Sequence, residues 1–127
     1  MVHKDHPLAS KGLSLEDYIR YPHSIIHTGE SPNTTIDIEL EKLGLKRNVV
    51  KRSPHFVASV MGIGDSNIIQ TIPKRLAEKM TRYTDLVMLD MPLEVGPVKV
   101  GQMWHVRDVK DPAHMWFREL IHSVATE

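Results

Sequence analysis

The feature of this sequence that most constrains its fold is a regular alternation of short apolar runs with helix-like segments between residues 23 and 89. Runs such as HSIIHT (23–28) and NIIQTI (67–72) have the length of strands and stop at a glycine or a proline. Parallel strands need a crossover connection, which is usually a helix. The alternation therefore predicts an α/β fold with right-handed crossovers and a largely parallel sheet.

Capping residues and prolines set the expected boundaries of these elements. Ser14 is a helix N-cap, Thr34 or Thr35 caps the next helix, and Pro54 opens a third with Ser53 as its cap. The final helix starts at Asp111-Pro112 and carries one apolar side, while residues 1–12 favour an extended or loop conformation. The expected helices are 15–21, 36–43, 54–61, 73–80 and one from 112, and the expected strands are 23–28, 48–52, 67–72, 86–89 and 98–106.

Composition narrows the class of protein. The 127 residues suit one domain, and equal numbers of basic and acidic residues (16 each) argue against a free-standing nucleic-acid binder. The absence of cysteine excludes disulfides and thiolate chemistry. The polar start does not look like an export signal, and the longest uncharged stretch, 53–64, is about half of the roughly 20 residues that a membrane span needs. We therefore expect a cytoplasmic protein that contacts no membrane.

Several segments in a fixed order carry a resemblance to a known family. They are His6-Pro-Leu-Ala9 with Leu13-Ser-Leu-Glu-Asp17, Ser53-Pro-His-Phe-Val-Ala58, Asn67 to Ala77 (NIIQTIPKRLA), Met103-Trp-His105, Asp111-Pro112 and Trp116-Phe-Arg-Glu-Leu120. Together they resemble the effector-binding domain of the LysR-type bacterial transcription regulators over nearly the whole chain. The segment 53–58 is close to the version in the branch that senses salicylate, nitroaromatics and related aromatic acids.

The resemblance implies a fold like a type II periplasmic binding protein, with two α/β lobes and a small-molecule effector between them. An aromatic acid is one candidate for this effector. Residues 1–127 would be part of such a domain: 16–89 the second lobe, and 98–127 a strand and helix that return to the first lobe. The family's N-terminal helix-turn-helix has no counterpart here, so DNA would be contacted only through that missing domain. The resemblance also implies a homodimer and no cofactor.

The candidate effector-binding residues begin with the loop that follows strand 48–52. His55 is the leading candidate, because it lies at a predicted helix N-terminus, where a carboxylate is favoured, and because the resembling branch uses this position. Pro54 shares the loop. Ser53 fits a helix cap at least as well as a ligand contact, and Phe56 is expected in the core rather than against a ligand.

Further candidates lie where other strands end, which is the edge at which open α/β sheets bind ligands. His27, Thr28 and Glu30 lie where the strand 23–28 ends in a turn, and Thr71 is at the end of the strand 67–72, before Pro73. Glu30 stands where the branch has a histidine, and its carboxylate would repel an anionic ligand, so it is favoured to face solvent. Thr71 fits the cleft and plain packing equally.

Other functions are less favoured. The eight histidines do not form a recognised metal motif, since His23 and His27 are four residues apart in a strand. No nucleophile elbow, phosphate loop or zinc-protease motif is present, so we expect no enzyme. The alternatives are a solute-binding protein of a transport system, which an upstream export sequence would favour, and a small α/β enzyme, which a turnover screen would detect.

Overall fold

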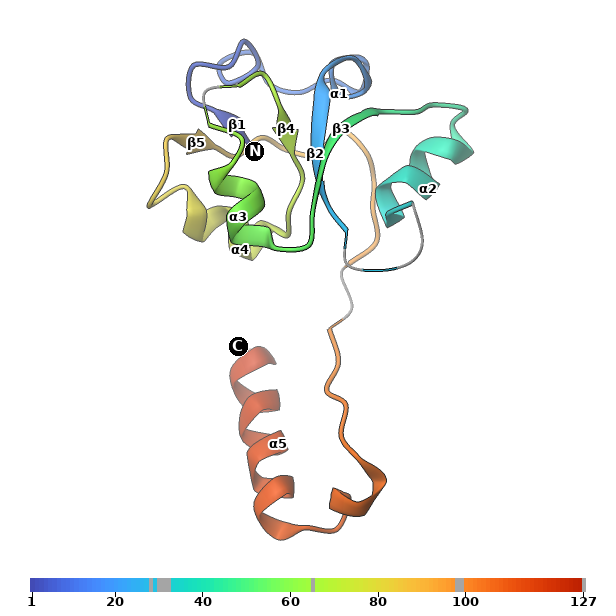
Figure 1. Ribbon diagram of the computed structural model, residues 1–127, viewed down its shortest axis with the longest axis vertical. Coiled ribbons are helices and arrows are strands. Elements are labelled where there is room, and N and C mark those ends of the chain that lie inside the picture. The colour runs from blue at the N-terminus through green and yellow to red at the C-terminus, as the bar shows by residue number, and fades with distance from the viewer. Residues whose placement is uncertain (28, 30–32, 65, 98–99, 127) are drawn as a thin grey trace. The chain divides into compact units, whose positions relative to one another are not determined.

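The computed structural model describes residues 1–27, 29, 33–64, 66–97 and 100–126. They divide into two compact units, Met1–Gly96 (unit 1) and Pro97–Glu127 (unit 2) (Figure 1). In chain order unit 1 contains β1 (Val2–His3), α1 (Leu15–Arg20), β2 (Pro22–Ile26), α2 (Thr35–Lys42), β3 (Asn48–Ser53), α3 (Phe56–Met61), β4 (Ile69–Gln70), α4 (Lys74–Met80) and β5 (Leu86–Val87).

A parallel sheet with the strand order β3-β2-β4 forms the centre of unit 1, as the alternation predicted. β1 and β5 pair separately and antiparallel. The backbone of Met1 connects the two sheets, because it exchanges two hydrogen bonds with Gln70 at the end of β4, of 2.8 and 2.9 Å. Such a reciprocal pair is the antiparallel pattern. β1 thus lies between β4 and β5 and runs against them.

Helices cover both faces of this sheet. One core cluster contains residues of α3 and α4, including Val60 and Ala77, and the other contains Tyr18 of α1 and Leu40 of α2. Neighbouring residues fall on opposite faces: Met1 belongs to the first cluster and Val2 to the second. This alternation is what a strand buried on both sides requires.

The N-terminal segment is more deeply buried than its polar composition suggests. The extended or loop conformation expected for residues 1–12 includes the strand β1, whose Val2 is fully buried, and Leu8 is buried as well. These apolar residues follow neither strand nor helix spacing. Nothing local in the sequence therefore marks them as core.

The helix boundaries agree with the caps except at α3. The Ser14 hydroxyl accepts from the Asp17 amide (3.1 Å), and Thr34 forms a capping box with Asp37. The prediction that Ser53 caps a helix from Pro54 is wrong. Ser53 is instead the last residue of β3, and α3 starts only at Phe56, with His55 at the N-cap position and no side-chain cap bond.

Unit 2 contains a short 3-10 helix, η1 (Val106–Asp108), and the helix α5 (Pro112–Thr126). The helix start at Asp111 is confirmed, since its Oδ1 accepts from the His114 amide at 2.7 Å. The strand expected over 98–106 is wrong: 100–105 have no regular structure, and 98–99 are outside the described residues. A strand needs a partner for its backbone groups, and none of the described strands of the chain pairs with this segment.

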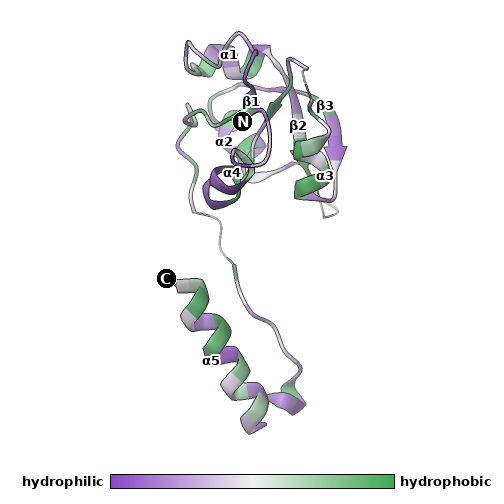
Figure 2. Ribbon diagram, turned by 90° about the vertical axis from the view of Figure 1, so that its left-hand side faces the viewer, coloured by the Kyte–Doolittle hydropathy of each residue, from purple (hydrophilic) through white to green (hydrophobic). Residues whose placement is uncertain are grey.

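The apolar residues of unit 2 are exposed. None of the residues described in α5 is buried, and Figure 2 shows hydrophobic residues recurring along this helix. Trp116, Leu120 and Val124, which belong to the apolar side of this helix, are 65%, 43% and 64% exposed. Within the parts of the chain that the structure describes, no helix combines the length and apolar character that crossing a membrane takes.

Candidate functional site

The carboxyl ends of β2, β3 and β4 meet at one edge of the sheet. Ile26 lies opposite Ser53, and the His27 amide donates to the Ser53 carbonyl at 2.9 Å. Thr71 directly follows Gln70, which is opposite Ser24. Four predicted residues, His27, Ser53, His55 and Thr71, therefore belong to segments that leave the sheet at this edge. Thr28 and Glu30, which were also predicted, lie outside the described residues.

The turn between β3 and α3 presents its side chains to solvent. Pro54 and His55 are exposed, and Phe56 is 40% exposed, so the expectation that Phe56 lies in the core is wrong. The Ser53 hydroxyl accepts from the His55 amide (3.3 Å) and donates to the His55 carbonyl (3.2 Å). Ser53 therefore shapes the turn, and the imidazole of His55 is accessible to a ligand.

The turn between β4 and α4 is held differently. Thr71 is half-buried, and its hydroxyl lies 2.9 Å from the hydroxyl of Tyr18. The Tyr18 hydroxyl also accepts from Arg47 (3.1 Å). The same guanidinium donates to Asp37 and to the Thr34 hydroxyl, both at 2.7 Å. These five residues are named here the Tyr18–Arg47 network.

Sequence reasoning missed the two central members of this network. Arg47 looked like part of an ordinary charged loop, Lys46-Arg47, yet its side chain is only 1% exposed. Tyr18 lay in a helix too short to show a buried face, and it is fully buried. The available signal was the Thr34-x-x-Asp37 capping box, because a buried carboxylate at a helix start requires a cation nearby.

The charged carboxylate and guanidinium of the Tyr18–Arg47 network stabilise each other. Burial alone would raise the pKa of Asp37, but hydrogen bonds from Arg47 and Thr34 outweigh it and hold that pKa at about 2. Burial raises the pKa of Tyr18, which keeps its hydroxyl protonated. Asp37 and Arg47 are therefore both charged near neutral pH. Removing one of them would leave the other buried and unpaired.

A second buried polar group lies on the other face of the sheet. The hydroxyls of Ser24 and Ser59 are 2.9 Å apart, and Ser59 donates to the Gln70 side-chain oxygen at 2.7 Å. All three residues are fully buried. Because Ser59 lies in α3, these bonds fix that helix, and with it the exposed His55 turn, against β2 and β4.

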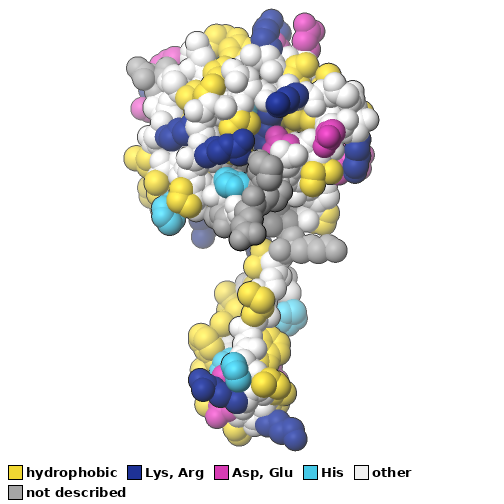
Figure 3. Space-filling view, turned by 45° about the vertical axis from the view of Figure 1, so that its right-hand side comes forward, with side chains coloured by type: hydrophobic (Ala, Val, Ile, Leu, Met, Phe, Trp, Pro, Cys, Tyr) yellow, Lys and Arg dark blue, Asp and Glu magenta, His cyan; other side chains and the backbone are white. Residues whose placement is uncertain are grey.

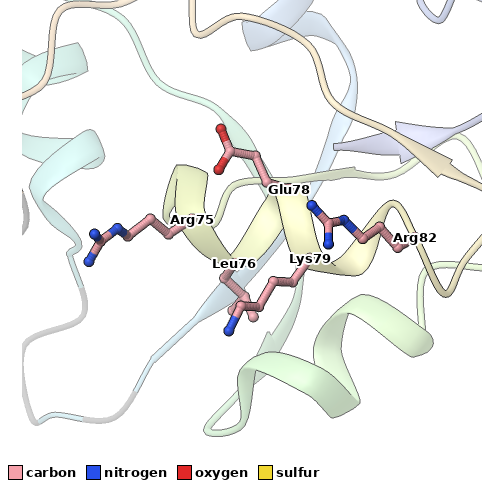
Figure 4. A pocket seen from close by; sticks show the side chains of 5 residues that line it. All are labelled: Arg75, Leu76, Glu78, Lys79 and Arg82. Atoms are coloured by element: carbon pink, nitrogen blue, oxygen red, sulfur yellow. The ribbon is translucent and has the colours of Figure 1, made fainter. Parts of the chain in front are cut away.

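Two surface hollows of unit 1 lie elsewhere. One, of about 580 Å³, lies on α4 and the turn after it (Figure 4), and the other, of about 550 Å³, lies between α2 and the 92–96 segment. Neither is lined by a predicted site residue. On the face of unit 1 in Figure 3, basic and acidic side chains are interspersed, in keeping with the net charge of zero.

Comparisons with known proteins assign the family. The model of the LysR substrate binding domain matches residues 1–126. The whole chain is similar to two transcriptional activators, NahR of Pseudomonas putida (26% identity) and NagR of a Ralstonia species (28% identity), and it covers 42% of each of them. A crystal structure assigned to the transcriptional regulators, from Vibrio parahaemolyticus, superposes on 96% of this chain with a TM-score of 0.83 at 30% identity, and 57% of that protein is covered.

These matches confirm the predicted fold class, an α/β fold of the type II periplasmic-binding-protein kind. The curated relatives are regulators, which favours an effector-binding regulator over the transport alternative. The chain spans less than half the length of those relatives. It belongs to the LysR substrate-binding domain family.

Proposed function

We propose that this chain is the effector-sensing part of a LysR-type transcription regulator and that the strand-end edge of unit 1 is one wall of its effector site. The family match over residues 1–126 carries this proposal. The edge supports it, since the turns after β3 and β4 leave the sheet there on either side of the end of β2, and open α/β sheets bind ligands at this edge. The ligand would favour one arrangement of the intact protein by differential contacts.

An aromatic acid is the proposed class of effector. The exposed imidazole of His55 can donate a hydrogen bond to a carboxylate, and the partly exposed ring of Phe56 offers an apolar surface beside it. The similarity to NahR and NagR is consistent with the aromatic-sensing branch that the segment 53–58 resembles. His27 and Thr71 complete the proposed wall. An opposite wall would come from a lobe outside this chain.

The remaining functions belong to the intact protein. DNA would be bound in the cytoplasm by a domain outside this chain, and catalysis is not expected. A homodimer is proposed because α3 presents Val57 (57% exposed) and Met61 (61%), one helical turn apart, on its outer side. Neighbouring exposed apolar residues of this kind are typical of protein–protein contacts.

The test uses the intact regulator that contains this chain and salicylate as the probe. We expect salicylate to raise the melting temperature, because a ligand that binds only the folded state stabilises it. His55→Ala should weaken salicylate affinity about tenfold, roughly 1.4 kcal/mol, as measured by calorimetry. Tyr83→Ala is the control, since Tyr83 is 81% exposed after α4 and away from the strand ends.

Each outcome separates a different part of the proposal. If salicylate and other aromatic acids leave the melting temperature unchanged, the effector class is wrong. If they bind, and His55→Ala binds as tightly as the unmodified protein, the class stands and the site assignment is wrong.

A further inference from the structure

We propose that Tyr18 and Arg47 are positioning residues of the effector site, which couple the β4–α4 turn to the start of α2. The inference rests on the proposed function, because it assigns a role at the same strand-end edge. Tyr18 and Arg47 need not touch the effector. They would keep the turn after β4 and the helix that follows β2 in one fixed arrangement.

The first argument is the reach of the two side chains across the sheet. Tyr18 belongs to α1, just before β2, and Arg47 immediately precedes β3, so both backbones lie near the amino ends of the strands. Their polar ends meet residues near the opposite edge: Thr71 directly follows β4, and Thr34 is the N-cap of α2, the helix that follows β2. Each side chain thus connects the two edges.

The second argument is that the network is continuous and largely enclosed. Arg47 donates to Tyr18, Thr34 and Asp37, and the Asp37 carboxylate also accepts from the Thr34 amide (2.7 Å) and hydroxyl (2.8 Å). Thr71 joins through Tyr18 alone among the bonds described. The guanidinium and the aromatic ring are rigid planar groups, and burial of both residues limits their rotamers, so a shift at one end is transmitted rather than absorbed. In low dielectric such bonds are also strong and mutually dependent.

The third argument is the contrast with the β3–α3 turn at the same edge. His55 and Pro54 are exposed, and the hydroxyl of Ser53 bonds only within its own turn in the interactions described. At this edge the β3–α3 turn is therefore accessible, whereas the β4–α4 turn and the start of α2 are held by the buried side chains of Tyr18 and Arg47. An effector that contacts Thr71 would change the position of α2 through the network, although α2 connects β2 to β3 and Thr71 follows β4.

Amide hydrogen exchange of the full chain tests the coupling without any ligand. Two amides report on the coupled segments. The Ile38 amide donates to the Thr34 carbonyl in the first turn of α2, and the Ala77 amide donates to the Pro73 carbonyl in the first turn of α4. The Gly62 amide, at the C-cap of α3, is the reference. Thr71→Val should accelerate exchange at Ile38 at least fivefold relative to Gly62. Asp37→Asn should do the same at Ala77. Among the interactions described, neither substituted residue contacts its distant reporter.

The relay itself is tested with Tyr18→Phe, which keeps the buried ring and removes only the hydroxyl. In that background Thr71→Val should no longer alter exchange at Ile38. Tyr21→Phe is the matched control, because it makes the same chemical change three residues away, outside the network. Equal acceleration at Ile38, Ala77 and Gly62 would show a purely global loss of stability, and no change at the distant reporter would show no coupling. Either result overturns the inference.

The second measurement is salicylate affinity of the intact regulator. Tyr18→Phe should weaken it about tenfold at a temperature where both proteins are fully folded, and Tyr21→Phe should leave it unchanged. Unchanged affinity in Tyr18→Phe overturns the positioning role. If salicylate fails to bind the unmodified regulator, the proposed effector class fails, and the exchange experiment still decides whether the two turns are coupled.

Discussion

The two units of the chain use the same local signals to start helices, but among the described residues only unit 1 has a buried core. Thr34 caps α2 in unit 1 and Asp111 caps α5 in unit 2. The side chain of each accepts a hydrogen bond from a backbone amide in the first turn of its helix. Leu40 of α2 is nevertheless fully buried, whereas Leu120 of α5 is 43% exposed. Local capping thus determines where a helix begins. Burial depends on which other segments are present to cover it.

Arg118 connects α5 to the segment before it in unit 2. Arg118 of α5 donates to the carbonyls of Asp108 and Val109, and its guanidinium lies 4.4 Å from the centre of the Trp104 ring. We expect the apolar side of α5 to be covered in the intact protein, as the proposed return of 98–127 to a first lobe requires. That assignment stays a prediction.

The largest difference between the two units should be in the loss of unfolding free energy when one leucine side chain in each unit is truncated to alanine. Leu40→Ala should lower the free energy of unfolding by about 3 kcal/mol, because it leaves a cavity in a closed core. Leu120→Ala should change it by less than about 0.5 kcal/mol in this chain, because an exposed leucine loses little burial. Urea unfolding is followed in unit 1 by the NMR signals of isotope-labelled tyrosine rings, since Tyr18, Tyr21 and Tyr83 all lie there. It is followed in unit 2 by tryptophan fluorescence, since both tryptophans lie in that unit. Equal losses in the two variants would mean that unit 2 has a core as well.

Acid should destabilise unit 1 through His23. Burial lowers the pKa of His23 to about 4; its Nε2 donates to the Tyr18 carbonyl, and Nδ1 has no partner among the described residues. The unfolded state, with the ordinary pKa of 6.5, then binds the proton first. The contribution of His23 to stability is therefore full above about pH 6.5 and falls by about 3 kcal/mol as the pH drops to about 4.

His23→Gln isolates this contribution, because the amide keeps a donor and does not titrate. Its unfolding free energy should vary less between pH 6.5 and 4 than that of the unmodified chain, with the remainder due to groups such as His6, whose pKa burial also lowers. Asp37 affects stability in a different pH range. Its pKa of about 2 means that the stabilisation it contributes is lost only below about pH 4. An unchanged slope in His23→Gln would contradict the assignment.

The smallest effects should come from the two caps. Thr34→Ala should cost unit 1 about 1 kcal/mol, because the α2 amide loses its acceptor and Arg47 loses a partner. Asp111→Ala should only fray the first turn of α5 and leave tyrosine-detected stability within about 0.5 kcal/mol. Tryptophan fluorescence reports the second change, since Trp104 and Trp116 both lie in unit 2. A joint loss of both signals in Asp111→Ala would mean that the units unfold together.

Much of the site was predictable because strand ends are marked locally. Gly29, Pro54 and Pro73 identified the turns at which three strands stop, and parallel strands must end at one edge. Side-chain roles within the turns were less predictable. Ser53 was assigned as a cap and Phe56 to the core, yet β3 extends through Ser53 and leaves the Phe56 ring partly exposed. How far a strand extends depends on its neighbour.

By itself the sequence determined the α/β class, the parallel sheet and the start of α5, because apolar spacing and capping act over a few residues. Tertiary structure alone decided that Val2 lies in the core, that Arg47 is buried against Tyr18 and Asp37, and that 100–105 form no strand. These outcomes depend on partners far away along the chain. A residue's own neighbours carry no information about such partners until the fold brings them together.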